Sequence, residues 1–178
     1  TDKNITLESL FSLLAPHWLA GNLLLAMAYF LTGNLGLLLA IPPGFATAVW
    51  PASGIALGWI LLYGWRLLPG VVCGSFAVKL VVTMKASGLG LFDVGWTVSG
   101  LIALGAAAQA WLGAALIRRY VDVSPGFEDP NVVIKTLVLG GLVATLLNAC
   151  WSVSVLYVSG HITLDRFLQN WLIWWAGD

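Results

Sequence analysis

Five long apolar stretches and the start of a sixth limit most strongly what this chain can fold into. Two of them, residues 18–41 and 94–117, exceed the ~20 apolar residues that a helix needs to cross a ~30 Å hydrocarbon core. The others cover approximately residues 49–63, 67–84, 136–159 and 168 onward. None alternates strictly between polar and apolar residues, so the ~10-residue strands of a membrane barrel do not fit. The sequence therefore predicts an all-α integral membrane protein, a polytopic helical bundle with five spans plus the start of a sixth.

Charge is too scarce for a soluble domain or for a protein that binds nucleic acid. Charged residues make up 9% of the chain and apolar residues 60%, whereas soluble domains average about 25% charged residues. The formal net charge is zero and no run of Lys or Arg is present, which excludes the basic surface that nucleic acid requires. We expect membrane lipid as a partner and no nucleic acid.

The first seventeen residues differ from the rest of the chain. They lack the basic start of a signal peptide, and the apolar stretch that follows is too long to be a signal-peptide core. We expect residues 1–17 to form a cytoplasmic amino-terminal segment and residues 18–178 to form one transmembrane domain. We also expect the sixth stretch to be truncated at Asp178.

Basic residues in the short connections predict the orientation, because Lys and Arg are retained preferentially on the cytoplasmic side. With the amino terminus inside, five basic residues lie on the cytoplasmic side and two, Lys85 and Arg166, on the other. The five are Lys3, Arg66, Arg118, Arg119 and Lys135. The connections over residues 42–50 and 160–171 would then both be extracytoplasmic, on one side of a multi-pass membrane protein.

The second and third stretches read as a tight helical hairpin, because only Gly64-Trp65-Arg66 separates them. Whether both arms cross the membrane fully stays open. Each arm carries a pair of glycines four residues apart, Gly54 with Gly58 and Gly70 with Gly74. Such pairs let helix backbones approach closely in a membrane.

The last residues of the chain place a carboxylate among tryptophans. Trp171, Trp174, Trp175 and Asp178 stand at i, i+3, i+4 and i+7, so a helix would present all four along one face. A carboxylate inside a span costs about 2.5 to 3.5 kcal/mol, so Asp178 should face the bundle interior and find a partner. Two alternatives stay open: the indoles belong to an interfacial aromatic belt, and Asp178 has a structural hydrogen bond or ion pair rather than a ligand.

Lys79 is the second charge inside an apolar stretch. Its side chain either extends to the membrane interface beside Lys85, pairs with Asp178, or meets an anionic ligand. Gln109, Asn148 and Ser152 are uncharged polar residues in the same surroundings. They are explained most simply by hydrogen bonds between helices, and they are secondary candidates for a pocket.

No pattern for catalysis or metal binding is present. Cys73 and Cys150 lie in apolar stretches and behave there as small hydrophobic residues. His17 and His161 are expected on opposite sides of the membrane, so they would not share a metal. The sequence has no phosphate-binding loop, no zinc-ligand spacing and no paired carboxylates on one helix. We expect no catalytic residue, no metal and no cofactor in this segment.

Several motifs together resemble one family. Trp50-Pro51-Ala52-Ser53-Gly54 opens the second stretch after a connection without charges, and Trp174-Trp175-Ala176-Gly177-Asp178 ends the chain. Between and before them stand Tyr29-Phe30, Gly64-Trp65-Arg66 with Pro69 and Gly74, and Leu116-Ile117-Arg118-Arg119. In these motifs the chain resembles the membrane-associated sensor domain of the first type (the MASE family).

The resemblance implies a sensory input domain in the bacterial cytoplasmic (inner) membrane. It would pass an extracytoplasmic or intramembrane stimulus to a cytoplasmic output domain in the same polypeptide, a histidine kinase or a cyclic-di-GMP enzyme. The stimulus would be an unknown small ligand or a partner protein, and a homodimer is expected by analogy with such outputs. The expected sensory residues are Trp50, Pro51, Gly54, Lys79, Asn148, Trp171, Trp174, Trp175 and Asp178.

Two other classes of protein fit the same composition. A small-molecule-capturing membrane subunit of an energy-coupling-factor type importer has a similar size and number of helices, and an outward-facing aromatic pocket would suit it. A purely structural membrane anchor would bind no ligand at all. The two readings differ from a sensor in their partners, which would be ATPase subunits for the importer and none for the anchor.

Overall fold

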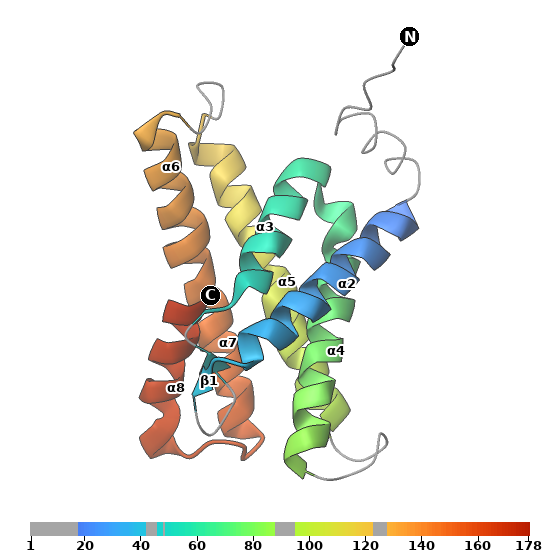
Figure 1. Ribbon diagram of the computed structural model, residues 1–178. Coiled ribbons are helices and arrows are strands. Elements are labelled where there is room, and N and C mark those ends of the chain that lie inside the picture. The colour runs from blue at the N-terminus through green and yellow to red at the C-terminus, as the bar shows by residue number, and fades with distance from the viewer. Residues whose placement is uncertain (1–17, 42–45, 48, 88–94, 123–127) are drawn as a thin grey trace.

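The structure, a computed structural model, describes residues 18–41, 46–47, 49–87, 95–122 and 128–178. The segment 1–17, most of the connection 42–49 and the side chain of Lys85 lie outside the description. Helices dominate, and Figure 1 shows them packed into one bundle, with a short pair of strands next to α8. In chain order the elements are α2 (Trp18–Leu37), β1 (Ala40–Ile41), β2 (Ala46–Thr47), α3 (Pro51–Tyr63), η1 (Trp65–Leu67), α4 (Leu68–Ser87), α5 (Gly95–Tyr120), α6 (Pro130–Thr136), η2 (Leu137–Val143), α7 (Ala144–Val158) and α8 (Leu164–Gly177).

The predicted helical membrane bundle is confirmed at the level of fold class. Within the described ranges, four helical segments are long and apolar enough to cross a membrane. They are Trp18–Leu37, Trp65–Val82, Gly95–Tyr120 and Pro130–Val158. Helices α3, with 13 residues, and α8, with 14, are shorter than a full crossing requires. The count of five spans plus the start of a sixth therefore stays a prediction.

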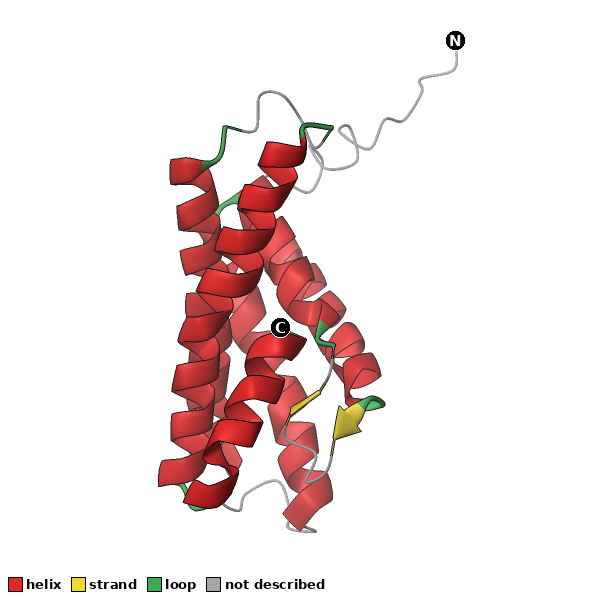
Figure 2. Ribbon diagram, turned by 90° about the vertical axis from the view of Figure 1, so that its left-hand side faces the viewer, coloured by secondary structure: helices red, strands yellow, loops and turns green. Residues whose placement is uncertain are grey.

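The first helix ends earlier than its apolar stretch, and a short hairpin follows. Helix α2 stops at Leu37, and Ala40–Ile41 pairs antiparallel with Ala46–Thr47. No strand was expected here. The reason is Pro42, which disfavours a helical conformation of the residue before it and cannot continue the helix itself. Figure 2 shows the two strands beside the otherwise helical bundle.

The fifth apolar stretch begins six residues earlier than predicted. Asp129 and Pro130 start helix α6: the Asp129 carboxylate accepts a hydrogen bond of 2.8 Å from the Asn131 amide, and Pro130 occupies the first turn. The helix then passes through a π-helical segment, η2, before continuing as α7. Segments of this kind occur frequently at functional sites.

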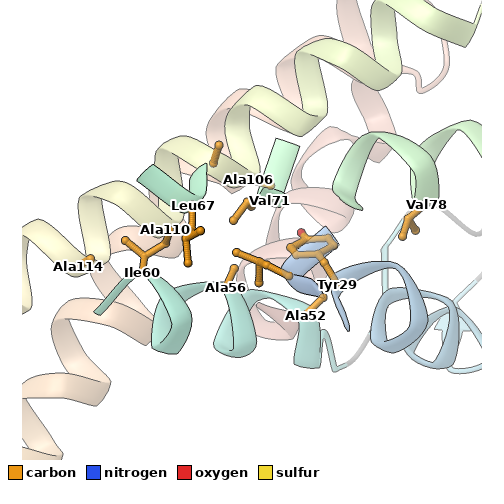
Figure 3. Packing of buried hydrophobic residues seen from close by; sticks show 12 residues of the cluster. Tyr29, Ala52, Ala56, Ile60, Leu67, Val71, Val78, Ala106, Ala110 and Ala114 are labelled. Atoms are coloured by element: carbon orange, nitrogen blue, oxygen red, sulfur yellow. The ribbon is translucent and has the colours of Figure 1, made fainter. Parts of the chain in front are cut away.

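Small residues allow the central helices to pack closely. Ala52 and Ala56 of α3 meet Ala106, Ala110 and Ala114 of α5 in one buried cluster, together with larger side chains from α2 and α4 (Figure 3). Without a hydrophobic drive between helices in lipid, close contact between backbones supplies much of the attraction. The cluster therefore fixes α3 against α5, next to the site described below.

The two predicted glycine pairs behave differently. A Cβ atom at Gly70 would lie 2.6 Å from the Asn22 carbonyl oxygen, and one at Gly74 would lie 2.8 Å from the Ala26 carbonyl oxygen, so this pair lets α4 contact the backbone of α2. At Gly54 and Gly58 a Cβ atom would meet nothing within 4 Å. Close packing of backbones is therefore absent at Gly54 and Gly58, and Gly54 instead lines a cavity between α3, α5 and η2.

Candidate functional site

The site forms where one helix starts and another ends inside the bundle. Helix α3 begins and helix α8 finishes near the middle of the molecule, close to the C label in Figure 1. The Trp50 amide donates to the Gly177 carbonyl over 2.7 Å, and the Ser53 hydroxyl donates to the Asp178 carbonyl over 2.8 Å. These bonds satisfy backbone groups that helix ends otherwise leave without partners. Such interrupted helices are tolerated inside a membrane only where protein or a cavity surrounds them.

The charge at this junction suits the helix that starts there. The amino-terminal end of α3 carries a partial positive charge, which favours a carboxylate nearby. Asp178 supplies one, and its Oδ2 accepts a hydrogen bond of 3.0 Å from Asn148 Nδ2 of α7. Asn148 Oδ1 in turn accepts from the Ser152 hydroxyl over 2.8 Å. Asn148 and Ser152 thus share one face of α7.

Lys79 brings the opposite charge into the same place. It is 8% exposed, and its Nζ lies 4.4 Å from the centre of the Trp174 ring and 5.4 Å from that of Trp50. Both distances suit attraction between a cation and an aromatic ring. The ammonium and the Asp178 carboxylate line the same small cavity and attract each other electrostatically. The alternative in which Lys79 extends to the membrane interface is therefore wrong.

Tyr29 of α2 completes the aromatic wall of this cluster. Trp50 Nε1 lies 3.2 Å from the Tyr29 hydroxyl oxygen and donates to it, and the two rings meet edge to face at 6.5 Å. The cavity that the cluster encloses has a volume of about 20 Å³, enough for about one water molecule. We call these residues the polar junction: Tyr29, Thr47, Trp50, Ser75, Lys79, Asn148, Trp174 and Asp178.

The predicted face of three indoles and a carboxylate divides into two rows. Trp174 and Asp178 point into the polar junction, whereas Trp171 and Trp175 stack on each other with ring centres 5.7 Å apart. Trp171 Nε1 approaches Cys150 Sγ at 3.2 Å, and Trp175 Nε1 donates to the Leu142 carbonyl over 3.0 Å. At 3.6 residues per turn, residues three apart differ by about 60° in direction, which is enough to separate the rows.

The remaining predicted residues lie beside the polar junction. Pro51 is exposed in the first turn of α3 and lines neither the small cavity of the polar junction nor the larger cavity described next. Gly54 lines a second and larger cavity of about 220 Å³, between α3, α5 and η2. Asp178 and Tyr29 line both cavities. Gln109 of α5 also faces the larger one, as a secondary pocket candidate would.

Three residues of the polar junction were not expected from the sequence as site residues. Ser75 and Thr47 are polar residues beside or within apolar stretches, and both are buried. The signal that marked Gln109 and Ser152, a polar residue in apolar surroundings, applied equally to Ser75. Tyr29 carried no such signal, because a tyrosine is ordinary in a membrane helix.

The described ranges contain no group of three His, Cys, Asp or Glu side chains placed to hold a metal ion. The chemistry of the polar junction is therefore that of one carboxylate, one ammonium, amides, hydroxyls and indoles. Such groups bind and position charged or polar molecules, or hold helices together.

Comparison with known proteins identifies the family. No curated protein and no solved structure matches the chain. The family model of MASE1 matches residues 21–178, which include the polar junction and every described helix except the first three residues of α2. By this match over nearly its whole length, the chain belongs to the MASE1 family of membrane sensor domains.

Proposed function

We propose that this domain is the transmembrane input of a bacterial signalling protein and that the polar junction is its sensory element. The output would be a cytoplasmic histidine kinase or cyclic-di-GMP enzyme in the same polypeptide. The observation that carries the proposal is the buried meeting of α3 and α8, with Lys79 and Asp178 on either side of a cavity of about 20 Å³. Interrupted helices with charged groups at their ends are how many membrane proteins bind ions and substrates near mid-membrane.

The polar junction joins two pairs of neighbouring helices, α2 with α4 and α7 with α8. It takes Tyr29 from α2, Lys79 from α4, Asn148 from α7 and Asp178 from the end of α8. A stimulus that weakens one of these contacts changes the position of α8 relative to α3. Signalling requires that the stimulus favour one of two arrangements, with typical coupling free energies of about 1 to 3 kcal/mol.

The energy available at the polar junction is sufficient for such coupling. Removing one partner of a buried charge pair costs about 3 to 5 kcal/mol in soluble proteins. This exceeds the coupling that a sensor needs, so even a partial change at Lys79 or Asp178 would shift the balance between two arrangements. A small ligand, the lipid or a partner protein would act through the same groups.

The proposed orientation follows the basic residues of the connections. The amino terminus and the η1 turn would lie on the cytoplasmic side of the inner membrane, and the β1–β2 hairpin and the start of α8 on the opposite side. Strand β2 and helix α8 are in contact, so the two motif-bearing segments are neighbours in space. The proposed homodimer would form through the output domains.

The test measures output from the full-length protein in its native membrane. Trp174→Ala and Asp178→Ala should each change kinase or cyclase activity severalfold while the protein still inserts. Trp111→Ala is the matched control, because Trp111 is 47% exposed on α5 and lies outside the polar junction. Normal output from both junction variants would rule out the polar junction as the sensory element.

A further inference from the structure

The larger cavity contains polar atoms that the described part of the protein leaves without partners. Gln109 is 6% exposed, and its Oε1 has no hydrogen-bond partner among the described residues; the same holds for Thr136 Oγ1. Both residues line the cavity of about 220 Å³. A buried carbonyl oxygen without a hydrogen bond is costly, and the cost is larger in the apolar middle of a membrane. The cavity therefore favours a molecule that donates a hydrogen bond.

The other residues that line the cavity indicate the polarity and size of such a molecule. Leu57, Ala106, Ala110 and Leu137 provide apolar surface, and glycines 54, 140 and 141 provide space. An apolar cavity of about 150 Å³ in another protein holds benzene, so 220 Å³ accommodates a ring with a polar substituent. Gly54 and Leu137 are also exposed, so the cavity meets the outer surface of the bundle between α3 and η2.

The charges nearby argue for a neutral molecule. Asp178 is the charged residue that lines this cavity, and it is already balanced by Lys79 in the polar junction. A cation would add an uncompensated charge in the membrane interior, which is expensive. A neutral molecule can also reach the opening from the surrounding lipid.

We propose that this cavity binds a small, neutral, largely apolar molecule with one hydroxyl or N–H donor, of the size of a phenol or an indole, with Gln109 Oε1 as the acceptor. The inference rests on the proposed sensory function and names the class of stimulus. Because Asp178 and Tyr29 line both cavities, a molecule bound here lies directly against the polar junction.

Binding is tested on the purified full-length protein in lipid nanodiscs by ¹⁹F NMR. The probe is 4-fluorophenol, and fluorobenzene is its counterpart without a donor. After subtraction of partitioning into empty nanodiscs, 4-fluorophenol should bind about tenfold more tightly, the effect of one buried hydrogen bond. Gln109→Met should remove this preference and leave fluorobenzene binding unchanged.

Glycine variants show whether weaker binding comes from filling the cavity or from a general effect on the protein. Gly141→Leu should weaken 4-fluorophenol binding at least tenfold, since a Cβ at Gly141 meets nothing within 4 Å and the added side chain takes up part of the space. Gly58→Leu is the control, because Gly58 has the same free space but does not line the cavity. Thermal unfolding of both variants verifies that they fold.

Either of two results would overturn the proposal: absence of saturable binding, including the case in which another part of the full-length chain fills the cavity, or equal affinity for the two probes. The binding measurement needs no kinase or cyclase output. If the probes do not bind, the proposed sensory function is still tested by the output of the junction variants. If those variants give normal output, the binding measurement still tests the cavity.

Discussion

At the scale of single residues, Lys79 and Asp178 show what apolar surroundings demand of a charge. Neither residue extends to the membrane surface; both line the polar junction, where indoles, an amide and the opposite charge surround them. The cost of a charge in a span predicted that Asp178 would find a partner inside the bundle. The identity of its hydrogen-bond donor, Asn148, depends on how α7 is rotated, which no local pattern encodes.

The pair should be coupled in stability. Lys79→Met leaves Asp178 without its compensating charge and should lower the free energy of unfolding by about 3 kcal/mol. The double variant Lys79→Met with Asp178→Asn removes both charges and should recover most of that loss. Denaturation of the purified protein in detergent micelles measures the two single variants, Lys79→Met and Asp178→Asn, and the double variant. Additive losses in the double variant would show that the two charges do not interact.

Asn22 has a structural role that its sequence position did not reveal. Its Oδ1 accepts from the Gly70 amide over 2.6 Å, and its Nδ2 donates to the Arg66 carbonyl over 3.0 Å, so a side chain of α2 satisfies the start of α4.

Asn22→Leu should lower the free energy of unfolding by about 1 to 3 kcal/mol, because the buried Gly70 amide and the partly buried Arg66 carbonyl lose their side-chain partner. The matched control is Asn34→Leu. Within the described part of the chain, Asn34 donates to the Phe30 carbonyl of its own helix, which keeps its helical bond, so its loss should cost less than 1 kcal/mol. Equal losses in the two variants would contradict this role for Asn22. The comparison uses the same micelle denaturation assay.

At the scale of elements, apolar length predicted where helices occur but not where they stop. Helix α3 starts at Pro51 because proline suits the first turn of a helix, and α2 stops before Pro42 for the opposite reason. Both prolines are visible in the sequence. The sequence does not show that α3 begins inside the bundle, against the end of α8. This position depends on tertiary contacts between residues more than a hundred positions apart.

The glycines of α4 offer a test of how helices α2 and α4 pack. Gly70→Ala places a Cβ 2.6 Å from a backbone oxygen of α2, so the helices must separate, and a loss of about 1 to 3 kcal/mol in the free energy of unfolding is expected. Gly58→Ala adds the same atom in open space and should be neutral or stabilising by up to about 1 kcal/mol, from helix propensity. If Gly58→Ala were the more destabilising, the arrangement of α2 and α4 described above would be wrong.

At the scale of the whole molecule, fold class and the grouping of motifs were predictable, and rotation about helix axes was not. Hydropathy identified helices that are long and apolar enough to cross a membrane, and the predicted grouping of the two motif-bearing segments agrees with the contact between β2 and α8. Hydropathy is nearly uniform around the long helices α2, α4, α5 and α7, so it does not indicate which of their faces meets a neighbour. In α8, Trp171 and Trp174 are the same residue type, so hydropathy does not distinguish them, and the structure shows that only Trp174 lines the polar junction.

The orientation of the bundle is tested by cysteine labelling in intact cells. In a variant without Cys73 and Cys150, His161→Cys should react with a membrane-impermeant maleimide added from outside. Lys135→Cys should react only after the membrane is permeabilised, since basic connections are retained inside. The reverse pattern would invert the proposed topology.

The meeting of α3 and α8 also bears on how the protein is made. Ser53 and Asp178 are hydrogen-bonded across 125 positions of the sequence, so α3 leaves the ribosome well before the residue that completes its first turn. Until α8 is synthesised and inserted, α3 is a short helix whose Trp50 amide lacks its partner, the Gly177 carbonyl. The polar junction is therefore assembled late in biogenesis, and a nascent domain arrested between these helices would expose α3 to membrane quality control.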